Sequence, residues 1–217
     1  MLKAVIMDFD GLIIDTEVVW FNIFVEWFKK NKDYDLSVEE FLLCVGSSSE
    51  DLFIKLELQN NWLIEREKFS FDTQTLFVQQ CELLYPKDGV IEFIQSIKNE
   101  GLKLSLATSA SKLKPLTQLK RLNLLHYFDL IVTAEDVERI KPHPDLFLKS
   151  IEKLKIDKTE ALIVEDSLNG LIAGQNAGID VLVVPNEVTK YSKFENYFEK
   201  ITSLSNVDIK ELIAKYN

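Results

Sequence analysis

Short apolar runs alternate with stretches of helical periodicity in the second part of the chain, and this alternation constrains the fold more than any other feature. The runs lie at 102–107, 130–132, 161–164 and 179–184, and a similar run at 5–7 opens the chain. The run at 5–7 contains no alternating polar residue, which is typical of a strand buried on both faces, and the other runs also have the length and composition of strands. Strands that alternate with helices form a parallel sheet through right-handed crossovers. The sequence therefore predicts an α/β fold with helices on both faces of one parallel sheet.

A helical insertion separates the first predicted strand from the others. Residues 15–83 contain no convincing strand, and the segment 18–28 is strongly apolar with helical spacing. The segment 37–40 carries Ser followed three residues later by Glu, which is the pattern of a capping box at a helix start. We therefore predict a core domain made of 1–14 and 84–217, and an inserted all-helical domain over 15–83.

The composition limits the partners of the chain. It has 25 Lys and Arg against 35 Asp and Glu, a net charge of −10, which disfavours binding to nucleic acid or to an anionic membrane. Its two cysteines, Cys44 and Cys81, suggest buried thiols and no disulfide framework. The chain starts directly with a strand pattern and has no apolar run of about 18 residues. We expect a cytoplasmic protein, either a monomer or a weak dimer, that binds a small molecule.

Two carboxylates follow the first predicted strand at once. Asp8 and Asp10 are two residues apart, so an extended backbone turns both side chains to the same side, and Gly11 then permits a tight turn. Two acids aimed together repel each other unless a cation or a proton lies between them. This pattern indicates a site for a hard metal ion and a possible carboxylate nucleophile. The alternative is a solvated loop or a helix cap.

Further polar residues follow the other predicted strands. Ser109 and Ala110 come after the second strand, Lys141 lies in the loop after the third, and Glu165 and Asp166 follow the fourth. Each has an alternative explanation as a helix cap, a surface lysine or acids at a helix start. The carboxyl ends of parallel strands meet at one edge of the sheet, where ligands bind. Because all of these polar residues are expected at that one edge, a functional site is favoured over the separate structural explanations.

The acids of this edge suit a magnesium ion. Asp8, Asp10 and Asp166 supply hard oxygen ligands, and Glu165 is expected either to bind the metal or to support a residue that does. Mg²⁺ prefers a few carboxylates together with water and substrate phosphate. The sequence therefore predicts Mg²⁺ as the cofactor and a phosphorylated metabolite as the substrate.

The remaining groups suit phosphate chemistry. The Ser109 hydroxyl, the Ala110 backbone N–H and the Lys141 ammonium can donate to phosphate oxygens. Asp8 is expected to attack phosphorus and form an aspartyl-phosphate. Asp10 is expected to protonate the leaving oxygen and then to take a proton from the attacking water.

Taken together, these motifs resemble the haloacid dehalogenase superfamily. The resemblance rests on four collinear blocks: Asp8-Phe9-Asp10-Gly11, Ser109, Lys141-Pro142, and Glu165-Asp166-Ser167 with Gly170 and Gly178 downstream. It extends from residue 3 to about 185 and points to the branch that contains β-phosphoglucomutase and small phosphatases. The resemblance implies a Rossmann-like core, a helical cap inserted after the first block, dependence on Mg²⁺ and the roles assigned above.

The insertion lacks the charges that the mutase branch is expected to carry. In that pattern a His follows the Asp-Thr pair, and a Lys and an Arg flank the cap glycine. Here those positions hold Trp20, Val45 and Ser49, which cannot pair with the charge of a second phosphate. We therefore predict a phosphatase of a small phosphomonoester, a sugar phosphate in the first place. The alternatives are a β-phosphoglucomutase-type isomerase and an inactive module that only binds a phosphorylated ligand, against which the intact aspartate pair argues.

Several further features have structural interpretations. We expect Thr16 to cap the first inserted helix and Glu17 to be an ordinary acid of its first turn. A helix from 38 is expected to run to 45 and to end at Gly46. The segment 186–217 is predicted to be a helical tail without a chemical signature.

Overall fold

The fold is built on one parallel sheet, seen in a computed structural model that describes residues 1–216. Six strands lie in the order β3-β2-β1-β4-β5-β6, and every neighbouring pair is parallel. Their bounds are β1 Ala4–Met7, β2 Lys103–Ala107, β3 Leu130–Val132, β4 Ala161–Glu165, β5 Asp180–Val183 and β6 Glu199–Lys200. The predicted α/β class with a Rossmann-like parallel sheet is confirmed.

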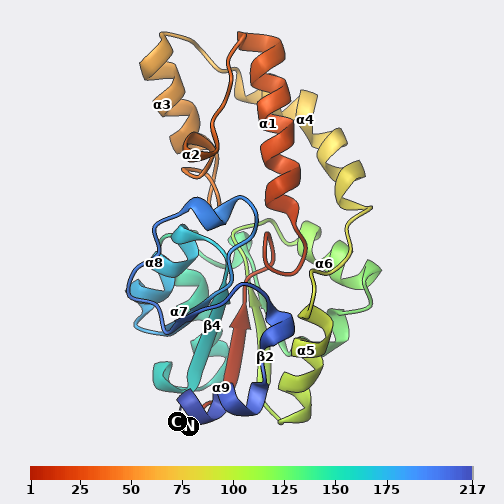
Figure 1. The fold of residues 1–217 in the computed structure, drawn as a ribbon, viewed down its shortest axis with the longest axis vertical. Coiled ribbons are helices and arrows are strands. Elements are labelled where there is room, and N and C mark those ends of the chain that lie inside the picture. The colour runs from red at the N-terminus through yellow and green to blue at the C-terminus, as the bar shows by residue number, and fades with distance from the viewer. Residues whose placement is uncertain (217) are drawn as a thin grey trace.

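Helices cover both faces of this sheet (Figure 1). Val5 and Met7 of β1 pack in one hydrophobic cluster, with side chains of α5, α6 and α9, while Ile6 points to the opposite cluster, with α7 and α8. This alternation explains the continuous apolar run, because both faces of the strand are buried. The helices are α5 Val90–Asn99, α6 Leu113–Arg121, α7 Asp145–Leu154, α8 Leu168–Ala177 and α9 Ile209–Tyr216.

Four further helices, the inserted helices, lie beyond the carboxyl ends of the strands, on the side away from the two termini (Figure 1). They are α1 Thr16–Lys32, α2 Val38–Phe41, α3 Glu50–Asn60 and α4 Arg66–Cys81. They share an aromatic core in which Phe24 contacts Phe41, Phe53 and Phe69 at ring-centroid distances of 4.7 to 5.9 Å. Two of these ring pairs are edge-to-face and the pair with Phe53 is stacked. Aromatic side chains bury large areas and favour such arrangements, so this small helical unit has a core of its own.

Lys87 joins the two chain segments that connect the inserted helices to the sheet. Its backbone N–H donates to the carbonyl of Ile13 at 2.9 Å, and its ammonium donates to the carbonyl of Gly11 at 2.7 Å. The entry and exit segments of the insertion are thus bonded to each other directly above β1. This arrangement positions the inserted helices over the end of the strand that carries Asp8.

Two local expectations are wrong. The capping box at Ser37 is present, but α2 ends at Phe41 and the chain continues to Gly46 in turns. The tail 186–217 is not a plain helix, because within its described part Glu199–Lys200 forms the edge strand β6 and α9 follows. A strand of two residues is too short to show a period of two in the sequence, so the pattern could not reveal it.

Candidate active site

The candidate site lies where three central strands end. Met7 of β1 is in register with Leu106 of β2 on one side and with Val164 of β4 on the other. Asp8 follows β1 directly and Glu165 is the last residue of β4, so the two lie at the same edge of the sheet. The strand order also reverses beside β1, and this is the position at which open α/β sheets bind ligands.

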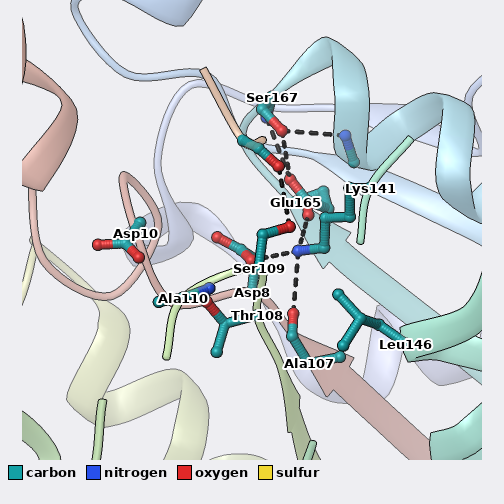
Figure 2. A network of polar contacts seen from close by, with 12 residues as sticks. Asp8, Asp10, Ala107, Thr108, Ser109, Ala110, Lys141, Leu146, Glu165 and Ser167 are labelled. Atoms are coloured by element: carbon teal, nitrogen blue, oxygen red, sulfur yellow. Dashed lines mark hydrogen bonds and ion pairs between the residues drawn. The ribbon is translucent and has the colours of Figure 1, made fainter. Parts of the chain in front are cut away.

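Lys141 connects the acids of this site. Its side chain is 1% exposed, and its ammonium contacts Asp8 Oδ1, Glu165 Oε1 at 2.5 Å and the Ala107 carbonyl at 2.9 Å (Figure 2). These three acceptors match the three protons of an ammonium group. The ammonium also lies 5.1 Å from the centre of the Phe147 ring. A buried charge needs this degree of pairing, so Lys141 fixes the orientation of both carboxylates.

Glu165 is held on its second oxygen as well. Its Oε2 accepts hydrogen bonds from the backbone N–H of Asp166 at 3.1 Å, the backbone N–H of Ser167 at 3.2 Å and the Ser167 hydroxyl at 3.0 Å. Gly170 approaches this carboxylate so closely that a Cβ there would collide with it. Glu165 therefore orders the loop after β4, and this loop carries Asp166.

A cluster of buried acids could hold a metal ion. Carboxylate oxygens of Asp8, Glu165 and Asp166 lie within 4.8 Å of one another. Burial raises the pKa of Asp8 to about 8, an effect that Lys141 opposes and Glu165 reinforces. Burial, followed by the charges of Glu165 and Asp8, also raises the pKa of Asp166 well above its usual value. Adjacent buried acids that resist ionisation in this way are the hard-oxygen donors that a divalent cation prefers.

Asp166 is also oriented from the loop after β5. The Asn186 amide donates to Asp166 Oδ2 at 2.8 Å and to the Gly11 carbonyl at 3.3 Å. Gly11 has a φ of +77°, and a Cβ there would collide with the Asp166 carboxylate. The glycine after the first acidic pair thus makes room for the third acid of the site.

Asp10 lies outside this acidic cluster. Its Oδ1 accepts a hydrogen bond from the Thr16 hydroxyl at 2.6 Å and forms an ion pair with Lys114 at 2.5 Å. The expectation that Thr16 caps the first inserted helix is wrong, because the N-cap is Asp15 and the hydroxyl binds Asp10. Asp10 lines the cavity, and its roles as a metal ligand and as a proton donor stay predictions.

The predicted phosphate donors lie beside Asp8 but bind protein groups here. The Ser109 hydroxyl donates to the Gly46 carbonyl at 3.1 Å, and the Ala110 N–H donates to the Thr108 hydroxyl at 3.1 Å. Figure 2 shows both residues near Asp8. A phosphate at this position would have to take over these donors from Gly46 and Thr108.

A cavity of about 230 Å³ opens in front of Asp8 and Asp10, between the sheet edge and the inserted helices. One wall is polar and includes Ser109 and Lys114. The facing wall is mainly apolar, and it is formed by Trp20, Phe24, Phe41, Cys44 and Phe69. Ser47 and Ser49 also line the cavity. Its size suits a small leaving group.

Four residues in or beside the site were not found as functional candidates from the sequence: Glu17, which lines the cavity, Lys114, Asn169 and Asn186. Asn186 lies just beyond β5, so the same search for polar residues after strands could have found it. Glu17 and Lys114 occupy first turns of helices, where sequence alone does not tell which way a side chain points. Asn169 donates to the Val45 carbonyl of the insertion, a contact that depends on tertiary packing.

The comparisons with known proteins agree with this geometry. The sequence model of the family described as "Haloacid dehalogenase-like hydrolase" matches residues 5–184, which include every predicted site residue. The chain belongs to this family. It is 33% identical over 218 residues to the Bacillus subtilis protein named "Putative phosphatase YhcW", covering 100% of this chain and 99% of the relative.

The chain is also similar to a relative that is named for an activity and to a solved structure with the same fold. The Thermotoga maritima "Phosphorylated carbohydrates phosphatase" is 30% identical over 182 residues, which are 82% of this chain and 83% of the relative. The crystal structure of β-phosphoglucomutase from Clostridium difficile covers 100% of this chain and 98% of its own, with a TM-score of 0.82 and 22% identity. At this identity the second comparison supports the fold alone.

As a haloacid dehalogenase-like hydrolase with relatives named as phosphatases, the chain is a hydrolase that acts on phosphate esters. The predicted family and enzyme class are confirmed. Within residues 1–216, no helix combines the length and the apolar character that a membrane crossing requires.

Proposed function

We propose that the chain is a Mg²⁺-dependent phosphatase of small phosphomonoesters, sugar phosphates in particular, which acts through an aspartyl-phosphate on Asp8. The observation that carries the proposal is the ion pair between the buried Lys141 and Asp8 at the floor of the cavity. Lys141 holds one oxygen of the Asp8 carboxylate and thereby orients this carboxylate towards the cavity, where a phosphate would lie. The relative named for phosphorylated carbohydrates supports the substrate class.

We also propose the division into domains that the sequence suggested. The core comprises 1–14 and 84–217, and the cap comprises 15–83. The separate aromatic core of the inserted helices and the bonds of Lys87 to both connecting segments support this division.

The donor set fits a magnesium ion. Asp8 and Asp166 would hold it, with Glu165 beside them, and Asp10 is the remaining predicted ligand. When bound, Mg²⁺ supplies positive charge that offsets the phosphate and the neighbouring acids. Because Glu165 already binds Lys141 and three donors of its own loop, its main contribution is to orient Asp166 and Lys141.

The two chemical steps follow from the positions of Asp8 and Asp10. In the first, an Asp8 oxygen forms a bond to phosphorus while the ester P–O bond breaks, and Asp10 gives a proton to the leaving oxygen. In the second, Asp10 takes a proton from water as that water attacks phosphorus and releases Asp8. Ser109, the Ala110 N–H and Lys141 would stabilise the charge on the phosphoryl oxygens in both steps.

Phosphate release from about a hundred phosphorylated metabolites, with Mg²⁺ and with chelator, tests this proposal. We expect metal-dependent turnover in the wild type at rates common for enzymes, about 1 to 10³ s⁻¹ for good substrates, and none in Asp8→Asn. Acid quenching with a ³²P-labelled substrate should trap label on the protein, which neutral hydroxylamine then removes. Folded protein without turnover on the whole panel would contradict the proposal.

Binding of Mg²⁺ can be measured separately from phosphatase activity. Calorimetric titration with Mg²⁺ should give a saturable signal in the wild type, and Asp166→Asn should weaken binding at least tenfold. Equal affinity for Mg²⁺ in both proteins would show that Asp166 is not a ligand of the metal ion.

The mutase alternative has less support. Of the described residues that line the cavity, Lys114 is the single cation, and it is already paired with Asp10. A mutase has to bind the second phosphate of a bisphosphate intermediate, so it needs a cation free for that purpose. Conversion of β-glucose 1-phosphate to glucose 6-phosphate with a bisphosphate activator would establish the alternative.

A further inference from the structure

Glu17 presents an unpaired carboxyl group to the cavity. It lies in the first turn of α1, is 7% exposed and lines the cavity together with Asp8 and Asp10. Within residues 1–216, no group donates a hydrogen bond or forms an ion pair with its side chain. Burial, followed by the charge of Asp10, raises the pKa of Glu17 to about 8. Most of the side chain is buried, but the carboxyl oxygens are not among the fully enclosed atoms, so they are accessible from the cavity to a group bound there.

The expectation that Glu17 is an ordinary acid of the first turn does not account for this position. An acid that only interacts with a helix N-terminus remains in solvent, where it needs no partner. The mechanism does not use Glu17 either, because Asp8 and Asp10 already provide the nucleophile and the proton donor. A ligand bound in the cavity is placed to supply the hydrogen-bond partner that no described residue supplies.

The surroundings restrict what that ligand can offer. Trp20 and Phe24 form part of an apolar wall, which suits the C–H face of a sugar or a polyol. Lys114 is close enough to lower the pKa of Glu17 and would repel a second ammonium group. A carboxyl group beside two aspartates also disfavours a second phosphate. The group best suited to Glu17 is therefore a neutral hydroxyl.

We propose that Glu17 is a specificity-determining residue that accepts a hydrogen bond from a hydroxyl of the leaving group, so that the site selects monophosphates of neutral polyols and sugars. This inference rests on the proposed phosphatase function and names the part of the substrate that the site recognises. Sites built to bind a substrate hydroxyl reject analogues that lack it far more strongly than apolar pockets reject a missing methylene.

The test compares substrates that differ in hydroxyl groups. Glucose 6-phosphate, ribose 5-phosphate and glycerol 3-phosphate supply hydroxyls, propyl phosphate supplies none and phosphoethanolamine supplies an ammonium group. The wild type should prefer the best hydroxyl-bearing ester over propyl phosphate at least tenfold in kcat/KM. Glu17→Gln should lower that preference about tenfold and Glu17→Leu should abolish it. The preference is a ratio of two kcat/KM values, so a change in activity that is common to both substrates cancels.

A matched control and a stability measurement separate specificity from folding. Glu26→Gln makes the same chemical change on an exposed residue of α1 and should leave the preference unchanged. Thermal unfolding of each variant identifies any that do not fold. If Glu17→Leu is among them, the nearly isosteric Glu17→Gln still measures the preference.

Each other outcome overturns a defined part of the inference. Equal losses on propyl phosphate and on the hydroxyl-bearing esters would make Glu17 a structural residue. If the wild type prefers phosphoethanolamine and Glu17→Gln loses this preference, the group that binds Glu17 is an ammonium group and not a hydroxyl. An unchanged preference in both Glu17 variants would refute the inference while leaving the phosphatase intact. Absence of turnover in the wild type, or turnover that persists in Asp8→Asn, would refute both proposals.

Discussion

The Ser47 hydroxyl donates a hydrogen bond to the backbone carbonyl of Lys141, with 2.7 Å between the two oxygens. A residue of the insertion is thereby bonded to the lysine whose ammonium holds Asp8. The Asn169 amide makes a second bond of this kind, to the Val45 carbonyl at 2.8 Å. The loop 45–47 is therefore held against the catalytic edge of the sheet, and movement of the insertion has to break these bonds. Closure of such an insertion excludes water from the reaction.

Removal of the Asn169 amide should weaken this closed arrangement. A neutral hydrogen bond contributes about 1 kcal/mol, so Asn169→Ala should raise KM for the best substrate roughly fivefold. Steady-state kinetics measure this effect, and Asn22→Ala, at an exposed position of α1, serves as the control. An unchanged KM in Asn169→Ala would show that the amide does not contribute to closure.

Replacement of Lys141 should destabilise the fold as well as stop turnover. Lys141→Met leaves Asp8 and Glu165 buried without their counter-charge. Breaking a buried ion pair from one side costs about 3 to 5 kcal/mol, so the midpoint of urea unfolding should fall accordingly. Lys193→Met, at an exposed position, should change the free energy of unfolding by about 0.5 kcal/mol or less. Equal stability of the two variants would contradict the structural role of Lys141.

The sheet and its acidic edge could be predicted because their signals are local. The strands β1 and β4 are continuous apolar runs, and Asp8 and Glu165 stand directly at the ends of these runs, where the register of a parallel sheet brings them together. Lys141 is further from its strand, yet it is a cation in a loop at the same edge. The order of strands and helices along the chain is therefore enough to predict that these three residues lie at the same edge of the sheet.

The contributions of the insertion could not be predicted in the same way. Glu17 and Lys114 approach Asp10 from two different helices, so their meeting depends on how the inserted helices sit on the sheet. The strand β6 is recognised only by its pairing with β5, because its two residues carry no periodicity. Tertiary packing decides these features, and local propensity does not report it.

Gly170 should not tolerate a side chain. A Cβ there would overlap the Glu165 carboxylate, so Gly170→Ala has to displace Glu165 from Lys141. Overpacking costs about 1 to 3 kcal/mol, and the displacement should lower kcat at least tenfold. Gly101→Ala is the control, since no atom lies within 4 Å of its Cβ position. It should cost about 1 kcal/mol through its positive φ and leave kcat unchanged. Similar kinetics of both variants would contradict the role assigned to Gly170.

The raised pKa of Glu17 makes the stability of the metal-free protein depend on pH. In the unfolded chain the group ionises near its ordinary value of 4.5, whereas in the folded protein it keeps its proton up to about 8. Between these values the folded state binds more protons than the unfolded state. The contribution of Glu17 to stability is therefore lost progressively as the pH rises through this window.

Glu17→Gln removes this dependence, because glutamine stays neutral at every pH. With chelator present, the variant and the wild type should unfold with similar free energies at pH 4, and the variant should become the more stable protein as the pH approaches 8. One pKa unit corresponds to about 1.4 kcal/mol, so a gain of roughly 2 kcal/mol or more is expected. Asp8 and Asp166 titrate in both proteins, so the difference between the two urea curves reports Glu17 together with its effect on the pKa of Asp166. A difference that stays constant from pH 4 to pH 8 would mean that folding does not raise the pKa of Glu17, and at neutral pH the cavity would then hold a negative charge beside Asp10.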